Sequence, residues 1–202
     1  CAGGPTPWGS WLTCEEDVTK MGEFDGNVEQ QHGYVFEVPA TTKIMRAAPK
    51  PIKAMGRFNH EAVAVDPKTG IVYLTEDRHD GLLYRYIPNV KNDLHSGGKL
   101  QALAVKSGPK FDTRNWPDTV GPDIQPNVPM KVEWIDLEDI DPAEDDLRIR
   151  GHEAGAAIFA RGEGMWYDEG VIYFACTSGG DLQKGQVFKF IPNPDNVDGG
   201  EL

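Results

Sequence analysis

The stretch at residues 70–77 reads GIVYLTED and returns 100 residues later, at 170–177, as GVIYFACT. After a short polar turn, each copy continues into a second related run, GLLYRYIPN at 81–89 and GQVFKFIPN at 185–193. The runs combine aromatic and β-branched residues, and each second run alternates before it ends at proline, which is typical of β-strands joined by turns. The pattern predicts a pair of antiparallel hairpins with the same construction.

The similarity extends to a strand before each hairpin and to a weaker third copy near the N-terminus. EAVAVD at 61–66 and EGMWYD at 163–168 occupy equivalent positions, and WLTCEE at 11–16 followed by GYVFEVP at 33–39 resembles the hairpin. KLQALAV at 99–105 is expected to form an outer strand. A repeat of antiparallel strands is typical of β-propeller blades. We therefore predict an all-β fold in which the chain forms about two to three blades.

Composition and length narrow the classes of protein that this chain can belong to. The 202 residues are expected to form part of a single propeller domain, 1–202, with an irregular insertion at about 107–150 that is rich in proline and acidic residues. The net charge of −12 argues against a nucleic acid or an anionic membrane as partner, since both require a basic face. No apolar run approaches the ~20 residues of a membrane span. A propeller closes with four to eight blades, so we expect the remaining blades to belong to a longer chain.

Candidate metal ligands lie at the ends of the repeated strands. The strand at 6–16 ends on Cys14, Glu15 and Glu16, which combine a soft thiolate ligand with hard carboxylates. Glu76 and Cys176 take the place of Cys14 in the other two copies, and Glu61 and Glu163 start equivalent strands. In a propeller such strand ends surround one axis, where clustered carboxylates repel one another unless cations are present. Cys14 and Cys176 could instead form a disulfide.

Two further residues stand beside the predicted glutamates. Arg161 and Glu163 are two positions apart, so on a strand they face the same side, where a guanidinium is suited to holding a phosphate or a carboxylate. An ion pair between the two is the alternative interpretation. His60 precedes Glu61 and is interpreted as a hydrogen-bonded histidine packed at a strand edge.

These motifs resemble those of the PhoX family of bacterial alkaline phosphatases. The resemblance rests on TPWGSWLTCEE at 6–16, RFNHE at 57–61 and RGEGMW at 161–166, and it spans nearly the whole chain. It implies a six-bladed propeller, a cluster of iron and calcium ions in the channel, hydrolysis of phosphate monoesters, and export to the periplasm or beyond. It also implies that Cys14, Glu61 and Glu163 are metal ligands and that Arg161 binds phosphate, with Glu15, Glu16 and Glu76 as further candidate ligands.

Two other functions fit a propeller with acidic strand ends. One is a calcium-dependent hydrolase of the lactonase type, which holds a single ion through carboxylates. The other is a non-catalytic, calcium-stabilised binding module. Cys14 distinguishes these from the phosphatase, because a site that binds only calcium does not use a thiolate.

Overall fold

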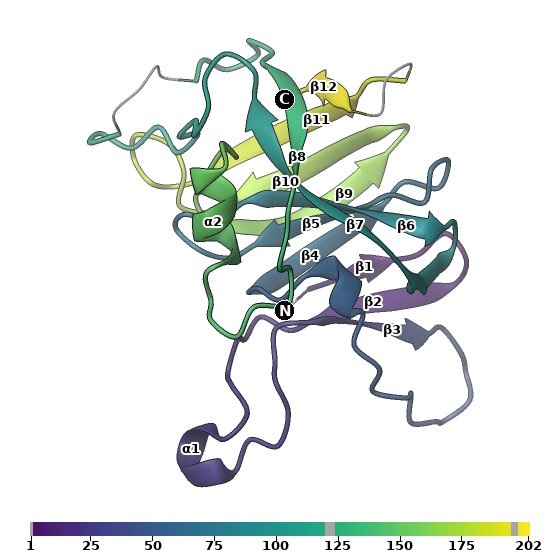
Figure 1. The fold of residues 1–202 in the computed structure, drawn as a ribbon. Coiled ribbons are helices and arrows are strands. Elements are labelled where there is room, and N and C mark those ends of the chain that lie inside the picture. Colours follow the sequence, from purple (N-terminus) through teal and green to yellow (C-terminus); the bar gives the residue numbers. More distant parts are fainter. Residues whose placement is uncertain (1, 120–123, 195–197) are drawn as a thin grey trace.

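The computed structural model describes residues 2–119, 124–194 and 198–202. The N-terminal part forms a small antiparallel sheet in the order β1-β2-β3. A short turn of helix, α1, lies in the long excursion between β2 and β3, and the 3₁₀ turn η1 follows β3 (Figure 1). The bounds of these elements are β1 (Gly4–Pro5), β2 (Ser10–Cys14), α1 (Glu23–Gly26), β3 (Val35–Pro39) and η1 (Lys53–Met55).

The rest of the chain forms a nine-stranded antiparallel sheet and one further helix. Its strands run in the order β4-β5-β6-β7-β8-β12-β11-β10-β9. The helix α2 (Leu147–Glu153) lies between β8 and β9 in sequence. The strands are β4 (His60–Val65), β5 (Val72–Glu76), β6 (Leu83–Val90), β7 (Asp93–Val105), β8 (Lys131–Asp136), β9 (Gly162–Asp168), β10 (Val171–Cys176), β11 (Gln186–Pro192) and β12 (Gly199–Glu201).

The predicted repeat is present as two four-stranded meanders, β4 to β7 and β9 to β12, so the all-β prediction is confirmed. The expected outer strand at 99–105 is the second half of β7. The stretch expected to be irregular contributes β8, which pairs with β7 on one side and β12 on the other. The two meanders are therefore continuous through β8 in one sheet that curves round on itself (Figure 1).

Burial differs sharply between the two meanders. Every residue of β4 and β5 is buried, as are the first four of β6, because one face of this meander packs on the N-terminal sheet and the other on the second meander. In β10 and β11 buried residues alternate with exposed or half-buried ones. Phe174, Phe188 and Phe190 point into the shared core, whereas Val187 is 77% exposed. Alternation of this kind indicates a sheet that is covered on one face only.

The N-terminal segment is joined closely to the first meander, at β4. Gly3 pairs in parallel with Ala62 of β4 and has φ +96°, and a Cβ at this position would lie 2.0 Å from the carbonyl oxygen of Leu12. Only glycine fits such a close approach.

No helix in the described ranges is long and apolar enough to cross a membrane.

Candidate functional site

The threonine hydroxyl of Thr75, on β5, fixes the starts of β4 and β9 relative to each other. Its Oγ1 donates to the carbonyl oxygen of Glu163 over 2.7 Å and accepts from the backbone N–H of Ala62 over 3.1 Å. The predicted ligands Glu61 and Glu163, which are 102 positions apart, therefore start strands that are joined through one buried side chain. The repeat predicted that these two glutamates start equivalent strands, which are β4 and β9 in the structure.

Cys14 ends β2 beside Glu61. The Cys14 thiol is buried and free, and burial together with the nearby charge of Glu61 raises its pKa to about 12. Glu61 is also buried, and its Oε2 accepts from the backbone N–H of Ala2 over 3.3 Å. A thiolate and a carboxylate side by side in a buried position repel each other, so the thiol remains protonated unless a cation neutralises the pair.

Arg161 connects the second meander to the end of β5. Its Nε and Nη2 donate to the two carboxylate oxygens of Asp77 over 2.8 Å and 2.7 Å, and Nη2 also donates to Oε1 of Glu163 over 2.9 Å. Thr177 donates to the same Glu163 oxygen over 3.1 Å. The hydrogen bonds to Asp77, with the charges of Asp77, Glu163 and Glu16, raise the pKa of Arg161. Arg161, Asp77 and Glu163 thus form one charged cluster. The ion pair between Arg161 and Glu163, which was the alternative interpretation of the sequence, is present.

Glu15 and Glu76 make their contacts on other elements. The Glu15 carboxylate accepts from His32 Nδ1 over 2.9 Å and from the backbone N–H groups of Gly33 and Tyr34 over 2.9 Å and 3.1 Å. Glu76 Oε2 accepts from the Tyr84 hydroxyl over 2.7 Å and from the N–H of Leu82 over 3.1 Å, inside the protein. These two carboxylates brace the fold in this structure, apart from the cluster around Arg161.

The second repeat cysteine and the histidine before Glu61 also lie in the core. Cys176 is a free thiol packed among the phenylalanines of the second meander, so Cys14 and Cys176 form no disulfide here. His60 is fully buried, stacks on Phe58 and shares a 3.1 Å hydrogen bond with the carbonyl of Gly56. Burial lowers its pKa to about 3, so the ring is neutral. The packed, hydrogen-bonded histidine expected at this position is what the structure has.

The donor set fits part of a mixed metal site. The Cys14 thiol provides a soft donor and the nearby Glu61 carboxylate a hard one, and the charge of Glu61 adds to burial in disfavouring ionisation of the thiol. Within residues 2–119, 124–194 and 198–202, no three histidine, cysteine or acidic side chains come together as a complete site. The described residues therefore do not form a closed metal cage by themselves.

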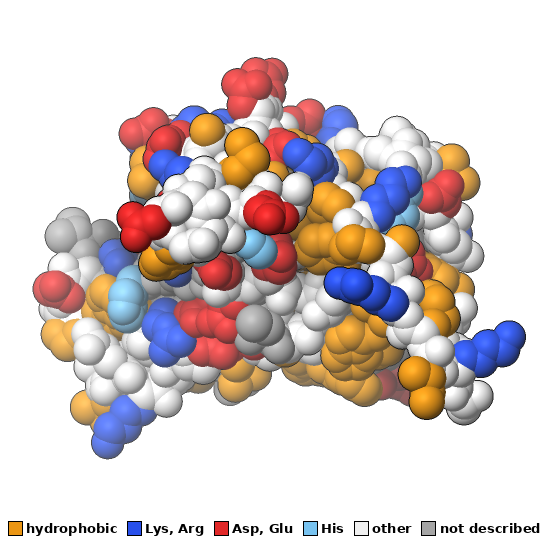
Figure 2. All heavy atoms as spheres, turned by 90° about the horizontal axis from the view of Figure 1, so that it is seen from below, with side chains coloured by type: hydrophobic (Ala, Val, Ile, Leu, Met, Phe, Trp, Pro, Cys, Tyr) orange, Lys and Arg blue, Asp and Glu red, His pale blue; other side chains and the backbone are white. Residues whose placement is uncertain are grey.

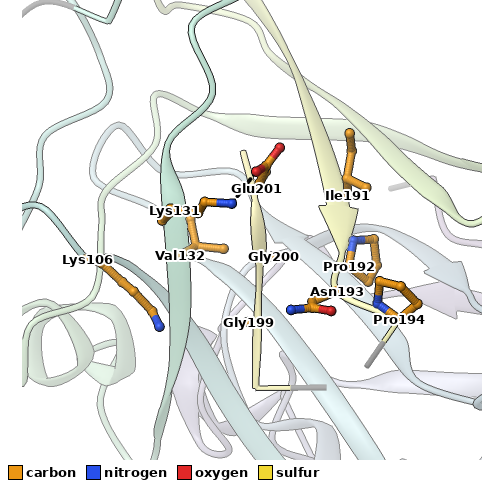
Figure 3. A pocket seen from close by; sticks show the side chains of 10 residues that line it. All are labelled: Lys106, Lys131, Val132, Ile191, Pro192, Asn193, Pro194, Gly199, Gly200 and Glu201. Atoms are coloured by element: carbon orange, nitrogen blue, oxygen red, sulfur yellow. Dashed lines mark hydrogen bonds and ion pairs between the residues drawn. The ribbon is translucent and has the colours of Figure 1, made fainter. Parts of the chain in front are cut away.

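Two cavities lie away from these residues. One of about 280 Å³ lies between β8, β12 and the end of β11, where Lys131 pairs with Glu201 (Figure 3). A larger one of about 940 Å³ lies beside Trp116 and Phe188. None of the predicted site residues lines either cavity. Figure 2 shows the underside of the molecule in Figure 1, where acidic and basic side chains are intermingled and hydrophobic side chains are exposed.

Asp77 is the residue of this cluster that the sequence did not single out. It follows Glu76 directly, and side chains of adjacent strand residues point to opposite faces. The repeat alignment drew attention to Glu76, which turns into the core, whereas its neighbour Asp77 turns toward Arg161. The sequence did contain a signal for Asp77, namely the two adjacent acids in LTED. Because side chains alternate along a strand, these two carboxylates are expected to point to opposite faces.

Comparison with known proteins agrees with this architecture. A search of curated proteins gives no match. The solved structure of Pseudomonas fluorescens PhoX in complex with vanadate, described as a transition state analogue, is similar with a TM-score of 0.69 at 20% sequence identity. The match covers 98% of this chain and 46% of that one, so the chain spans about half the length of the solved protein. The family model for alkaline phosphatase PhoX matches residues 1–200. This chain therefore belongs to the PhoX family of alkaline phosphatases.

Proposed function

We propose that this chain carries part of the active site of a metal-dependent alkaline phosphatase that hydrolyses phosphate monoesters and uses iron and calcium. Membership of the family supports the reaction class. The observation that carries the proposal is the cluster in which Arg161 lies between Asp77 and Glu163. Thr75 joins the strand of Glu163 to the strand of Glu61, whose charge acts on the buried Cys14 thiol. The periplasmic or extracellular location that the family resemblance implies belongs to the same proposal.

The charges of this cluster explain why a phosphatase built on it needs cations. Arg161 with Asp77 and Glu163 has a formal net charge of −1, and Glu16 acts on the same guanidinium. A phosphate ester dianion that approaches this cluster is repelled, although Arg161 is a suitable hydrogen-bond partner. Multivalent cations held by neighbouring carboxylates would reverse the sign of the field.

The residues proposed to hold those cations are Cys14, Glu61 and Glu163, with Glu16 beside them. The soft thiolate suits iron, and the hard carboxylates suit calcium or iron. When bound, such ions would supply Lewis acidity toward phosphate oxygens and toward water. Glu15 and Glu76 are the less favoured ligands, since their carboxylates already accept two or more hydrogen bonds within the protein.

Arg161 is the group of this chain proposed to contact the substrate. Its side chain is 37% exposed, so solvent and ligands reach it. Nε and Nη2 are occupied by carboxylates, whereas Nη1 donates to no acceptor among the described residues. The two N–H groups on Nη1 are thus available to a phosphate oxygen, where a fixed positive charge stabilises charge that develops during hydrolysis.

Replacement of Glu163 tests this proposal. We expect E163Q to lower bound iron and calcium and to lower turnover of p-nitrophenyl phosphate by about 10- to 100-fold or more, by analogy with the loss of groups that support metal ligands. Metal is measured by elemental analysis of the purified enzyme. The matched control is E153Q, since Glu153 is an exposed glutamate at the end of α2. Unchanged metal content together with an unchanged rate in E163Q would refute the assignment.

A further inference from the structure

Arg161 has an unusual backbone conformation for a residue that must present its side chain accurately. Its φ is +57°, in the left-handed region that non-glycine residues adopt rarely and that is concentrated at functional sites. The conformation is fixed by two backbone hydrogen bonds, from Arg161 N–H to the carbonyl of Arg78 over 2.8 Å and from Thr177 N–H to the carbonyl of Arg161 over 3.0 Å. The peptide is thus held on both sides.

The side chain is held by the same turn as the backbone. Asp77 precedes Arg78 and receives two parallel hydrogen bonds from the guanidinium, which fix its plane as well as its distance. Asp77 is itself immobilised, because its N–H donates to the carbonyl of Asn59 over 3.1 Å and Asn59 Nδ2 donates to its carbonyl over 3.0 Å. Asp77 is 8% exposed, so little water competes for its carboxylate.

We propose that Asp77 is a positioning residue for the phosphatase reaction: it holds the Arg161 guanidinium in one orientation and leaves Nη1 for the substrate. The inference rests on the proposed function of Arg161. It adds a residue directly after β5, 84 positions away in sequence, that acts through Arg161 and does not touch the phosphate. Misplacement of a catalytic group by about 1 Å costs on the order of 100-fold in rate, so such a carboxylate affects kcat more than KM.

The test compares D77N, R161A and the double variant in the metal-loaded enzyme with p-nitrophenyl phosphate. Asparagine keeps the shape of the side chain but removes the charge and one of the two acceptors. We expect kcat to fall by about 10- to 100-fold in D77N with a smaller change in KM. In the R161A background D77N should cost no more than about 2-fold, because the partner that it positions is already gone. The matched control is D112N, which breaks the similar bidentate pair between Asp112 and Arg114 outside this cluster.

A second readout does not depend on activity. Hydrogen exchange of the Arg161 Nε–H, followed by ¹⁵N NMR, should be slow in the wild type and at least about 10-fold faster in D77N, since the acceptor has weakened. If D77N does not fold, the exchange rate of Arg161 Nε–H in the wild type is compared with that of the exposed Arg46. Equal rates for the two arginines would overturn the inference.

The remaining outcomes separate this inference from the proposed function. If R161A is strongly impaired while D77N is as active as the wild type, positioning by Asp77 is wrong and the role of Arg161 stands. If R161A retains full activity, the proposed role of Arg161 fails, and positioning by Asp77 fails with it. Equal additional losses from D77N in both backgrounds would show that Asp77 acts only on the stability of the fold.

Discussion

The Cys14 thiol and the Glu61 carboxylate lie close enough that the charge of Glu61 adds to burial in raising the pKa of the thiol, to about 12. The two side chains come from different strands, β2 and β4, and are 47 positions apart. A protein gains no stability from this placement, because the charge of Glu61 disfavours the thiolate form of Cys14. A cation bound there, as proposed, would remove this cost.

The first prediction concerns that thiol. We expect the iron-loaded protein to absorb visible light through thiolate ligation, and we expect C14A to lose this absorption together with most of its bound iron, since the remaining ligands are hard. The control is C176A, which removes an equally buried thiol from the core of the second meander. Iron content and absorption that survive in C14A would show that Cys14 is not an iron ligand, whereas a wild-type protein that binds calcium and no iron would favour a calcium-only propeller hydrolase or binding module.

The second prediction concerns the buried carboxylate of Glu76. Burial raises its pKa from 4.5 to about 7, against hydrogen bonds from Tyr84 and Leu82 and the charge of Arg148. The folded state therefore binds this proton more tightly than the unfolded state, and the stability that the protonated form provides is lost as the pH rises from about 4.5 through 7. The shift corresponds to about 3 kcal/mol.

Urea denaturation of E76Q between pH 4.5 and 8 checks this. We expect the free energy of unfolding of E76Q to rise relative to that of the wild type as the pH increases from 4.5 to 7, because glutamine does not titrate and the variant lacks the opposing Glu76 contribution. The raised pKa of Glu76 would be contradicted if the free energy of unfolding of the wild type rose steadily from pH 4.5 to 7 by more than the titration of His60 accounts for. E153Q, at an exposed position, should behave like the wild type.

The third prediction concerns acid. The pKa of His60 is lowered to about 3 because the ring is fully buried, so the unfolded state binds the proton more tightly. The stability that the neutral ring provides is therefore complete above the unfolded pKa of about 6.5 and is lost as the pH falls toward 3, by up to about 1.4 kcal/mol per pH unit. Between pH 4.5 and 6.5 this opposes the Glu76 effect, so in E76Q the acid-induced decline should begin near pH 6.5.

H60Q in the E76Q background separates the two groups. Glutamine does not titrate, so the decline that begins near pH 6.5 should disappear, although the loss of the stacking contact with Phe58 lowers stability at every pH. If the free energy of unfolding of this double variant still declined by the same amount as the pH falls below 6.5, the decline would be caused by groups other than His60.

The fourth prediction concerns the two faces of the second meander. F174A removes a buried ring that packs on Phe159 and Phe188, and we expect it to lower the free energy of unfolding by about 3–5 kcal/mol. V187S changes a side chain on the opposite, exposed face and should change the stability of this 202-residue chain by no more than about 0.5 kcal/mol. A large loss in V187S would show that this face is covered by another part of the polypeptide or by a second copy.

The sequence alone predicted those features that follow from local patterns. Alternation and aromatic, β-branched runs identified β4 to β7 and β9 to β11, whereas β12 was not predicted. The repeat aligned Glu61 with Glu163, and the structure joins their strands through Thr75. The motifs at 6–16, 57–61 and 161–166 indicated the family that the chain belongs to.

Tertiary structure decided which of the repeated side chains share a site. Register shifts interrupt the pairing between His60 and Val63 and between Phe174 and Cys176, and such irregularities change which face the neighbouring residues occupy. Glu76 enters the core and Asp77 meets Arg161, although both acids stand at the same strand end. The connection of the meanders through β8 likewise depends on contacts between strands remote in sequence, which no periodicity within a single segment records.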